Sequence, residues 1–370
     1  MKELNRMMLL CATSMAAIGC NAAGMDENLS KITLPPGFSI SIYAENLQNP
    51  RQLALGDQGT VFAGSEAAGN VYAVEDNNSD YIADGIYIID QKLNRPTGVE
   101  FKFGSLYVAA LDRILRYDDV EPNVNQPPAP DVVTAGLPDQ AHHGNRVLRF
   151  GPDGLLYVSI GAPCNVCVEA GFAQIRRMEA DGSGEEVYVS GVRNSVGLAF
   201  SPGTGHLWFT DNGRDLLGDD IPADELNEVT QPGQDFGFPF CHQGDLLDAE
   251  FGQGKSCSDF TPPAVKLSAH AAALGLTFYT GQMFPPDYTG ALIIARHGSW
   301  NRSKKIGYDL AVVRFDAGGK PLAPEVFASG WLQGEQEWGR PNDVMQLADG
   351  SLLVSDDMAN VIYRISYAAH

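Results

Sequence analysis

The stretch GLLYVS at residues 154–159 decides the fold, because five related copies accompany it along the chain. Each copy starts with glycine, continues through aliphatic or aromatic residues and ends with a small residue. The other copies are GTVFAG at 59–64, GSLYVA at 104–109, GHLWFT at 205–210, GALIIA at 290–295 and GSLLVS at 350–355. Most intervals between copies are close to the roughly 40–50 residues of a four-stranded propeller blade.

Short apolar runs flank every copy, as in RQLAL (51–55) and NVYAVED (70–76). They are rich in β-branched and aromatic residues and are bounded by Gly, Pro, Asn and Asp, which is typical of strands. The sequence therefore predicts an all-β six-bladed β-propeller with four-stranded blades, formed by residues 25–370 as one domain. The stretch GFSISIYAENL (37–47) would supply the outer strand of the last blade and close the ring. The long interval between the fourth and fifth copies predicts an insertion between blades 4 and 5.

Residues 1–24 have the pattern of an export signal. Lys2 and Arg6 form a short basic region, and an apolar segment of signal-peptide length follows at 7–18. We therefore expect an exported protein in the periplasm. Gly19-Cys20 resembles a lipobox, in which case a lipid on Cys20 would anchor the protein to the envelope. Cleavage by the ordinary signal peptidase near Ala22 or Ala23 is the alternative. No later segment reaches the roughly 18 apolar residues of a spanning helix.

The charge balance excludes one class of partner. The chain has 25 basic and 46 acidic residues and a formal net charge of −21. Nucleic acid binding needs a basic surface, so we expect no nucleic acid partner. A neutral or cationic small molecule, or a bound divalent cation, is compatible with this charge.

Four cysteines follow the leader. In an oxidising compartment we expect the local disulfides Cys164–Cys167 and Cys241–Cys257. A zinc site is the alternative, although a single CxxC lacks its usual second CxxC.

The residues just before the innermost strands should form a ring around the propeller axis, because all these strands start at the same face. Arg and His dominate these positions. They are Arg51, Arg95, His142, His143, Arg146, Arg193, Asn194, His270, Arg340 and Asn342. Charged side chains are rarely buried without partners, so we expect a shared anionic ligand in this funnel.

Several longer stretches resemble a known family. They include HHGNRVLRFGPDGLLYVSIGAPCNVC (142–167), TDNGRDLLGDD (210–220), HGSWNRS (297–303) and GRPNDV (339–344). Together they resemble soluble sugar dehydrogenases that use pyrroloquinoline quinone (PQQ), particularly the sorbosone and aldose dehydrogenase-like branch. The resemblance covers nearly all of residues 33–367. It implies PQQ- and Ca²⁺-dependent oxidation of an aldose-type sugar at its anomeric carbon, with an external electron acceptor.

The resemblance also implies roles for individual residues. His143, in the pattern His143-Gly-Asn-Arg146, would be the general base, with Arg193 as a second catalytic residue. Consecutive side chains of an extended segment point to opposite sides, so only one histidine of the pair can face the axis. The spacing to Arg146 selects His143. The cofactor contacts would be His142, Asn194, His297, Arg340 and Arg95.

Two places for Ca²⁺ follow from the same resemblance. Backbone carbonyls of Gly213 and Arg214 would hold the ion at the cofactor, and Glu225 would bind a nearby ion. Ca²⁺ prefers such oxygen ligands, and arginine forks suit the three carboxylates of PQQ. One departure concerns Ala162, which stands where glucose-oxidising members have an aspartate that orients the base. We therefore do not expect glucose specificity.

A weaker Ca²⁺ site lies in the acidic loop EDNNSDYIADG (75–85). Its oxygen-bearing side chains alternate as in a calcium loop, but the glycine of the sharp turn is missing. The candidate ligands are Asp76, Asn78, Asp80 and Asp84. A solvated turn is the alternative.

Two other functions compete with sugar oxidation. A calcium-dependent propeller hydrolase, such as a lactonase, would need inward Asp, Glu and Asn side chains around the axis. A non-catalytic binding propeller would not need the base.

Overall fold

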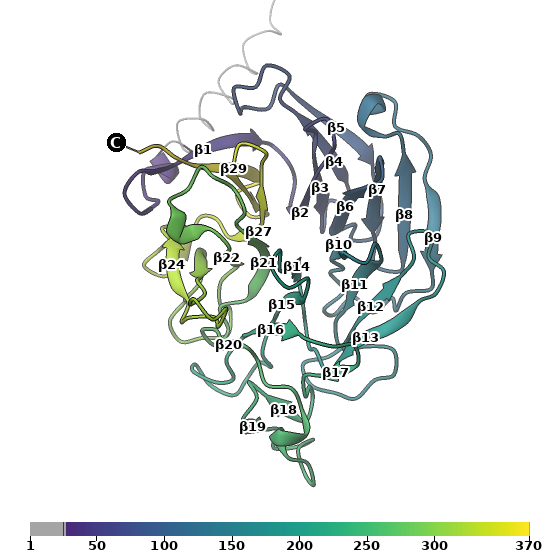
Figure 1. Cartoon of the computed structure of the whole chain (residues 1–370), viewed down its shortest axis with the longest axis vertical. Helices are drawn as coiled ribbons and strands as arrows, with labels where there is room; N and C mark the ends of the chain where they lie inside the picture. The colour runs from purple at the N-terminus through teal and green to yellow at the C-terminus, as the bar shows by residue number, and fades with distance from the viewer. Residues whose placement is uncertain (1–24, 26, 370) are drawn as a thin grey trace, which may run out of the picture.

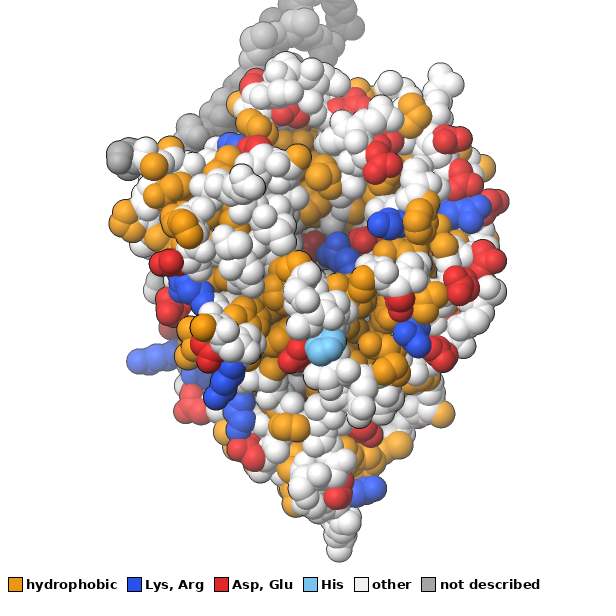
Figure 2. All heavy atoms as spheres, in the orientation of Figure 1, with side chains coloured by type: hydrophobic (Ala, Val, Ile, Leu, Met, Phe, Trp, Pro, Cys, Tyr) orange, Lys and Arg blue, Asp and Glu red, His pale blue; other side chains and the backbone are white. Residues whose placement is uncertain are grey.

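The computed structural model describes residue 25 and residues 27–369, so the predicted leader and the anchor at Cys20 lie outside the described residues. Six mainly antiparallel sheets, five with four strands and one with five, surround a central axis, which confirms the six-bladed propeller (Figure 1). Within the described part of the chain, no helix is both long and apolar enough to span a bilayer. On the face seen in Figure 2, acidic and basic side chains are interspersed.

The blades follow one another along the chain. The first comprises β2 (Pro50–Leu55), β3 (Val61–Ser65), β4 (Val71–Glu75) and β5 (Gly85–Asp90). The second comprises β6 (Gly98–Lys102), β7 (Ser105–Ala109), β8 (Arg113–Asp118) and β9 (Asp131–Ala135). The third comprises β10 (Leu148–Phe150), β11 (Leu156–Ile160), β12 (Gln174–Met178) and β13 (Glu186–Ser190), extended by β17 (Gln234–Asp235).

The remaining blades contain the insertion and the closure of the ring. The fourth comprises β14 (Gly197–Phe200), β15 (Leu207–Asp211), β16 (Glu225–Val229) and β20 (Val265–Lys266). The fifth comprises β21 (Ala273–Phe278), β22 (Leu292–Arg296), β23 (Asp309–Val313) and β24 (Glu325–Ala328). The sixth comprises β27 (Pro341–Gln346), β28 (Leu352–Asp356), β29 (Val361–Tyr367) and β1 (Phe38–Glu45).

Short elements occupy the connections. They are β18 (Cys241–His242), β19 (Leu246–Leu247), β25 (Leu332–Gln333), β26 (Gln336–Glu337) and the 3₁₀ helices η1 (Glu121–Asn123), η2 (Cys257–Asp259) and η3 (Pro286–Tyr288).

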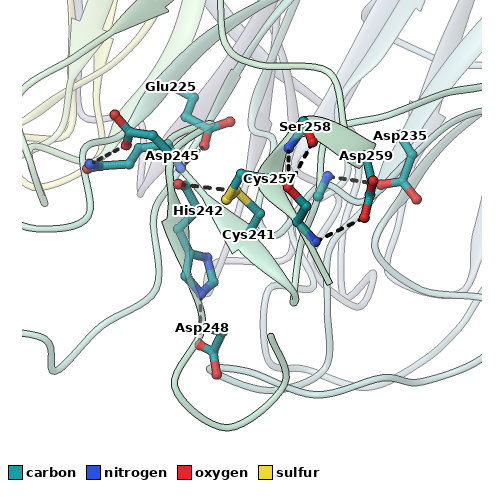
Figure 3. The surroundings of a disulfide bond; sticks show 12 residues. Glu225, Asp235, Cys241, His242, Asp245, Asp248, Cys257, Ser258 and Asp259 are labelled. Carbon is teal, nitrogen blue, oxygen red and sulfur yellow. Dashed lines mark hydrogen bonds and ion pairs between the residues drawn. A yellow bond between two sulfur atoms is a disulfide. The ribbon is translucent and has the colours of Figure 1, made fainter. Parts of the chain in front are cut away.

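β1 closes the ring as predicted, since it pairs antiparallel with β29 and aligns Phe38 with Tyr367. The insertion is placed differently from the prediction. The chain leaves the fourth blade after β16 and returns to it at β20. The insertion therefore lies within the fourth blade, before its outer strand, and not between the fourth and fifth blades. Both predicted disulfides are confirmed, and Cys241–Cys257 lies inside this insertion (Figure 3).

The glycine that opens each repeated stretch has a backbone reason. All six have a positive φ, between 71° and 99°, in the turn that leads from the inner strand to the second strand. L-residues with a side chain rarely adopt this conformation, whereas glycine does so without steric cost. They are Gly59, Gly104, Gly154, Gly205, Gly290 and Gly350.

Polar side chains join the inner strands of neighbouring blades at the axis. Gln52 on β2 accepts hydrogen bonds from the backbone amides of Val99 and Leu148, which belong to the second and third blades. Its amide nitrogen donates to the Leu148 carbonyl. Between the blades, the side chains are apolar and form clusters such as Phe62, Phe101, Leu106 and Val108. The strands are thus fixed side by side, and the loops at their ends are held rigidly around the axis.

Candidate functional site

A cavity of about 500 Å³ opens at the face where the inner strands begin. The loops before these strands and the loops after the second strands line it. The predicted residues that it gathers are Arg51, His143, Arg193, Asn194, Gly213, His270, His297 and Arg340. Arg95, His142, Arg214 and Glu225 are not among the lining residues.

His143 is fixed by the backbone. Its Nδ1 lies 2.8 Å from the Ala162 carbonyl oxygen, which accepts only if Nδ1 carries the proton. Nε2 of the neutral ring is then left with its lone pair. The carbonyl of Ala162 thus takes the place of the orienting acid that the sequence lacks. Burial, then the charges of Arg193 and His142, lower the pKa of His143 to about 2, so the imidazole is neutral at ordinary pH.

His142 lies beside this ring but outside the cavity. It is exposed, and its ring centroid is 4.1 Å from that of His143. The segment is a turn, with His143 at φ 48°, so the extended geometry expected from the sequence is wrong. His143 nevertheless is the histidine of the pair that lines the cavity.

Arg193 is buried, and its hydrogen bonds lie within the protein. Its Nη1 donates to the Gly213 carbonyl at 2.8 Å, and its Nη2 lies 2.7 Å from Asp215 Oδ2. Nε donates to the carbonyl of Asn165, inside the loop closed by Cys164–Cys167. Arg193 therefore joins the third-blade disulfide loop to the fourth-blade wall of the cavity.

The arginines that line the cavity are paired with carboxylates, which the sequence did not predict. The acidic residues that line the cavity are Glu66, Asp215, Asp224 and Glu337. Arg51 forms ion pairs with Glu66 and Asp357, and Arg340 forms one with Asp357. The missed acids had a signal in the sequence. Glu66, Asp215 and Asp357 all follow closely after a copy of the repeated stretch, in the loop that reaches the same face as the funnel.

Arg95 does not line the cavity itself but contacts Glu66, which does. Its Nη1 lies 3.5 Å from Glu66 Oε1 and donates to the Ala141 carbonyl at 2.9 Å. Its own backbone has a φ of 51°, which turns the side chain toward the loop that contains His142. It thus supports the wall rather than lining it.

The predicted cation ligands lie beneath the fourth-blade wall. Glu225 and Asp211 are buried around a void of about 10 Å³ that Gly213 and Arg214 also line. Burial, then the charge of Asp211, raise the pKa of Glu225 to about 8. The Glu225 oxygens accept hydrogen bonds from the Gln243 amide at 2.7 Å and the Asn227 side chain at 3.0 Å.

The donor set fits a cation only in part. Two buried carboxylates that repel each other are a pair that a divalent ion would stabilise. The Gly213 carbonyl already accepts from Arg193, and Arg214 forms an ion pair with Asp248. In the residues that the structure describes, no group of three or more His, Cys, Asp or Glu side chains is arranged to hold a metal. A cation here would depend on carbonyl oxygens as well.

The insertion supports this wall from outside. Figure 3 shows His242 beside the Cys241–Cys257 disulfide, with its ring directed at Asp248. His242 Nε2 lies 2.8 Å from Asp248 Oδ2, and the same carboxylate pairs with Arg214. The insertion therefore holds the loop that carries Gly213 to the cavity.

In the acidic loop at 75–85, the side chains mostly serve the loop itself. Asp76 accepts from the Tyr81 amide, Asp80 from the Ile82 amide and Asp84 from the Asn77 amide. Asn78 accepts from the Asp80 amide. These bonds are those of a solvated turn, and the weaker calcium site stays a prediction.

This chain is similar to known proteins over most of its length. A model of the family described as TrAA12-like matches residues 32–366. An uncharacterized protein of Borreliella burgdorferi is 32% identical over 370 residues, which cover 96% of this chain and 96% of that protein. A protein of Hypocrea jecorina named pyrroloquinoline quinone-dependent sugar dehydrogenase is 23% identical over 82% of this chain and 81% of its own.

Solved structures share the fold. The iodide structure of Trichoderma reesei Carbohydrate-Active Enzymes Family AA12 superposes with a TM-score of 0.80 at 20% identity, covering 91% of this chain and 98% of that one. A calcium structure with the same family title has a TM-score of 0.80 at 19% identity, covering 91% and 97%.

Proposed function

Because this chain belongs to the TrAA12-like family, we propose that it is a dehydrogenase that oxidises a sugar with PQQ as cofactor. A single observation carries the proposal. On the propeller axis, a neutral histidine with its Nδ1 proton fixed on a backbone carbonyl shares one cavity with three arginines. The name of the Hypocrea jecorina relative supports the choice of cofactor and substrate class.

The residues present fit an anionic quinone. Three residues that line the cavity have a buried polar atom without a hydrogen-bond partner within the described residues: Arg51 Nε, Asn145 Oδ1 and Asn301 Oδ1. A bound polar group would supply such partners. Asn194, His297 and Arg340 would hold the cofactor from the cavity wall, with His142 and Arg95 as outer supports.

When bound, PQQ would supply the hydride acceptor for the sugar carbon, and Ca²⁺ held beside it would make that acceptor more electrophilic. The ion would be held by carbonyl oxygens at Gly213 and Arg214, with Glu225 near a further ion. The calcium structure of the AA12 protein supports this cation.

His143 performs the proton transfer in this proposal. Its Nε2 takes the proton of the anomeric hydroxyl, while Nδ1 keeps its hydrogen bond to the Ala162 carbonyl. General base catalysis of this kind contributes about 10² to 10⁴-fold. Arg193 beside it disfavours the imidazolium, so an anionic group bound near Arg193 would make His143 a stronger base.

The mouth of the cavity offers a surface for the sugar ring. Trp300 lines it and is 72% exposed, which is high for a tryptophan in a folded protein. Sugars stack on such exposed aromatic faces. Trp338 has a different place, since its Nε1 donates to the Gly330 carbonyl and its ring packs against Trp331.

Export belongs to the proposal as well. The leader pattern at 1–24 and the two disulfides are typical of an exported protein, in the periplasm or held at the envelope by lipid. Electrons would then pass to an external acceptor.

Reconstitution tests the proposed function. The purified protein would be titrated with PQQ in the presence of Ca²⁺ while the absorbance spectrum is followed, and dye reduction would then be measured with a panel of aldoses. We expect a saturable spectral change and sugar-dependent reduction. Absence of both rejects the proposal, and binding without turnover indicates a non-catalytic propeller.

A calcium-dependent hydrolase is a second candidate. The four carboxylates that line the cavity favour it, together with Asn145, Asn194, Asn212 and Asn301. Two of these acids, Glu66 and Asp215, are paired with arginine, which leaves fewer for a metal. Hydrolysis of lactones with Ca²⁺ alone, in the absence of PQQ, would establish this function instead.

A further inference from the structure

One buried carboxylate holds the cationic side of the cavity. Asp357 follows directly after β28 and is 2% exposed. Its carboxylate lies 2.9 Å from Arg51 Nη2, 2.7 Å from Arg340 Nε and 3.0 Å from His297 Nε2. All three partners line the cavity, whereas Asp357 itself does not.

The three partners come from three blades. Arg51 lies on β2 of the first blade, His297 follows β22 of the fifth, and Arg340 precedes β27 of the sixth. Two guanidinium groups that converge on one point repel each other unless a negative charge lies between them. Asp357 supplies this charge at the point where the ring of blades closes.

Asp357 also determines which nitrogen of His297 carries a proton. A carboxylate only accepts hydrogen bonds, so Nε2 of the neutral ring must donate to Asp357. Nδ1 is then left as the acceptor on a side chain that lines the cavity. Without the carboxylate, neither the tautomer nor the ring orientation would be set.

We propose that Asp357 is a positioning residue, whose carboxylate fixes Arg51, His297 and Arg340 in the arrangement that receives the anionic cofactor. The part that concerns the cofactor rests on the proposed function. The fixing of the three side chains is a property of the chain alone, and it can be measured without cofactor.

The first measurement is PQQ affinity by absorbance titration in Asp357→Asn. Charge alone predicts tighter binding, because the variant makes the cavity more positive. Positioning predicts the opposite, and we expect affinity to fall about tenfold or more because Arg51, His297 and Arg340 lose their shared partner. Unchanged or tighter binding overturns the proposal.

Asp309→Asn is the matched control. Asp309 is also buried and forms a bidentate pair with Arg296 at 2.6 Å, but neither residue lines the cavity. We expect this variant to lose stability and keep wild-type PQQ affinity. An equal loss of affinity in both variants would mean that Asp357 acts only through stability, and would overturn the proposal.

The second measurement needs no cofactor. Nitrogen NMR of His297 should show the Nε2–H tautomer in the wild-type protein and a changed signal in Asp357→Asn; an unchanged signal overturns the proposal. If the wild-type protein fails to bind PQQ, the proposed function fails and the NMR signal alone decides the role of Asp357.

If Asp357→Asn does not fold, Asp357→Glu keeps the charge and displaces the carboxylate. A PQQ affinity below that of the wild type and a shifted His297 signal are expected. Wild-type values of both overturn the proposal.

Discussion

Replacement of His143 by alanine is the sharpest perturbation of the proposed chemistry. The change removes Nε2 as proton acceptor and the 2.8 Å hydrogen bond of Nδ1 to the Ala162 carbonyl. Loss of a general base lowers kcat by about 10² to 10⁴-fold, which corresponds to roughly 3–5 kcal/mol of transition-state stabilisation. The side chains proposed to hold PQQ belong mainly to other blades, so cofactor affinity should change little. Stopped-flow and steady-state dye reduction, with PQQ titration alongside, measure the two effects separately.

His142→Ala is the control for this experiment. His142 is exposed and lies beside the ring of His143 without lining the cavity. Its removal should lower kcat by less than about tenfold and mainly weaken cofactor or sugar binding. The reasoning is refuted if His142→Ala abolishes turnover at normal cofactor affinity while His143→Ala stays active.

Three further predictions concern catalysis and stability. A Cβ on Gly161 would lie 2.7 Å from the Cβ of His143, so Gly161→Ala should displace the base and lower kcat about 10²-fold at nearly unchanged PQQ affinity, in the same assays. Burial raises the pKa of Asp343 to about 6, so the folded state keeps a proton that the unfolded chain releases, and stability falls as pH rises from about 4 to 6. Asp343→Asn should make this slope shallower in urea unfolding at several pH values, by up to about 3 kcal/mol across the window, and an unchanged slope would contradict the assignment. Removal of the Cys241–Cys257 disulfide, with its sequence separation of 16, should lower the free energy of unfolding by about 3 kcal/mol, again measured in urea.

The fold could be predicted because its signal repeats. Six glycines occur at the same point of six hairpins, and each is required by a left-handed backbone conformation. The closing role of β1 was predictable for a related reason, since the last blade has no further strand in the sequence after its third strand. The exact place of the insertion could not be predicted, because its short strands carry little apolar periodicity.

The cavity could be predicted only in part. Arg95, His143 and His270 all have positive φ values, so alternation along an extended strand does not determine where their side chains point. The pairing carboxylates could not be predicted from the ring of Arg and His residues, because that ring lies in the loops before the inner strands and the carboxylates lie mainly in other loops. Asp357 lies in a loop that follows the second strand of a blade, and these loops reach the same face from the outer side.

The pairing of β1 with β29 has a consequence for how the chain reaches its native state. Phe38 and Tyr367 lie at opposite ends of the described chain, yet they are partners in one sheet. Contacts so distant in sequence form late, because ordering the long intervening segment costs entropy before the contact stabilises it. During synthesis the first strand must therefore wait, without its partner in the sheet, until the last has been made. A circular permutant that joins these ends and begins between two other blades would replace this distant contact with a local hairpin, and should close its ring sooner.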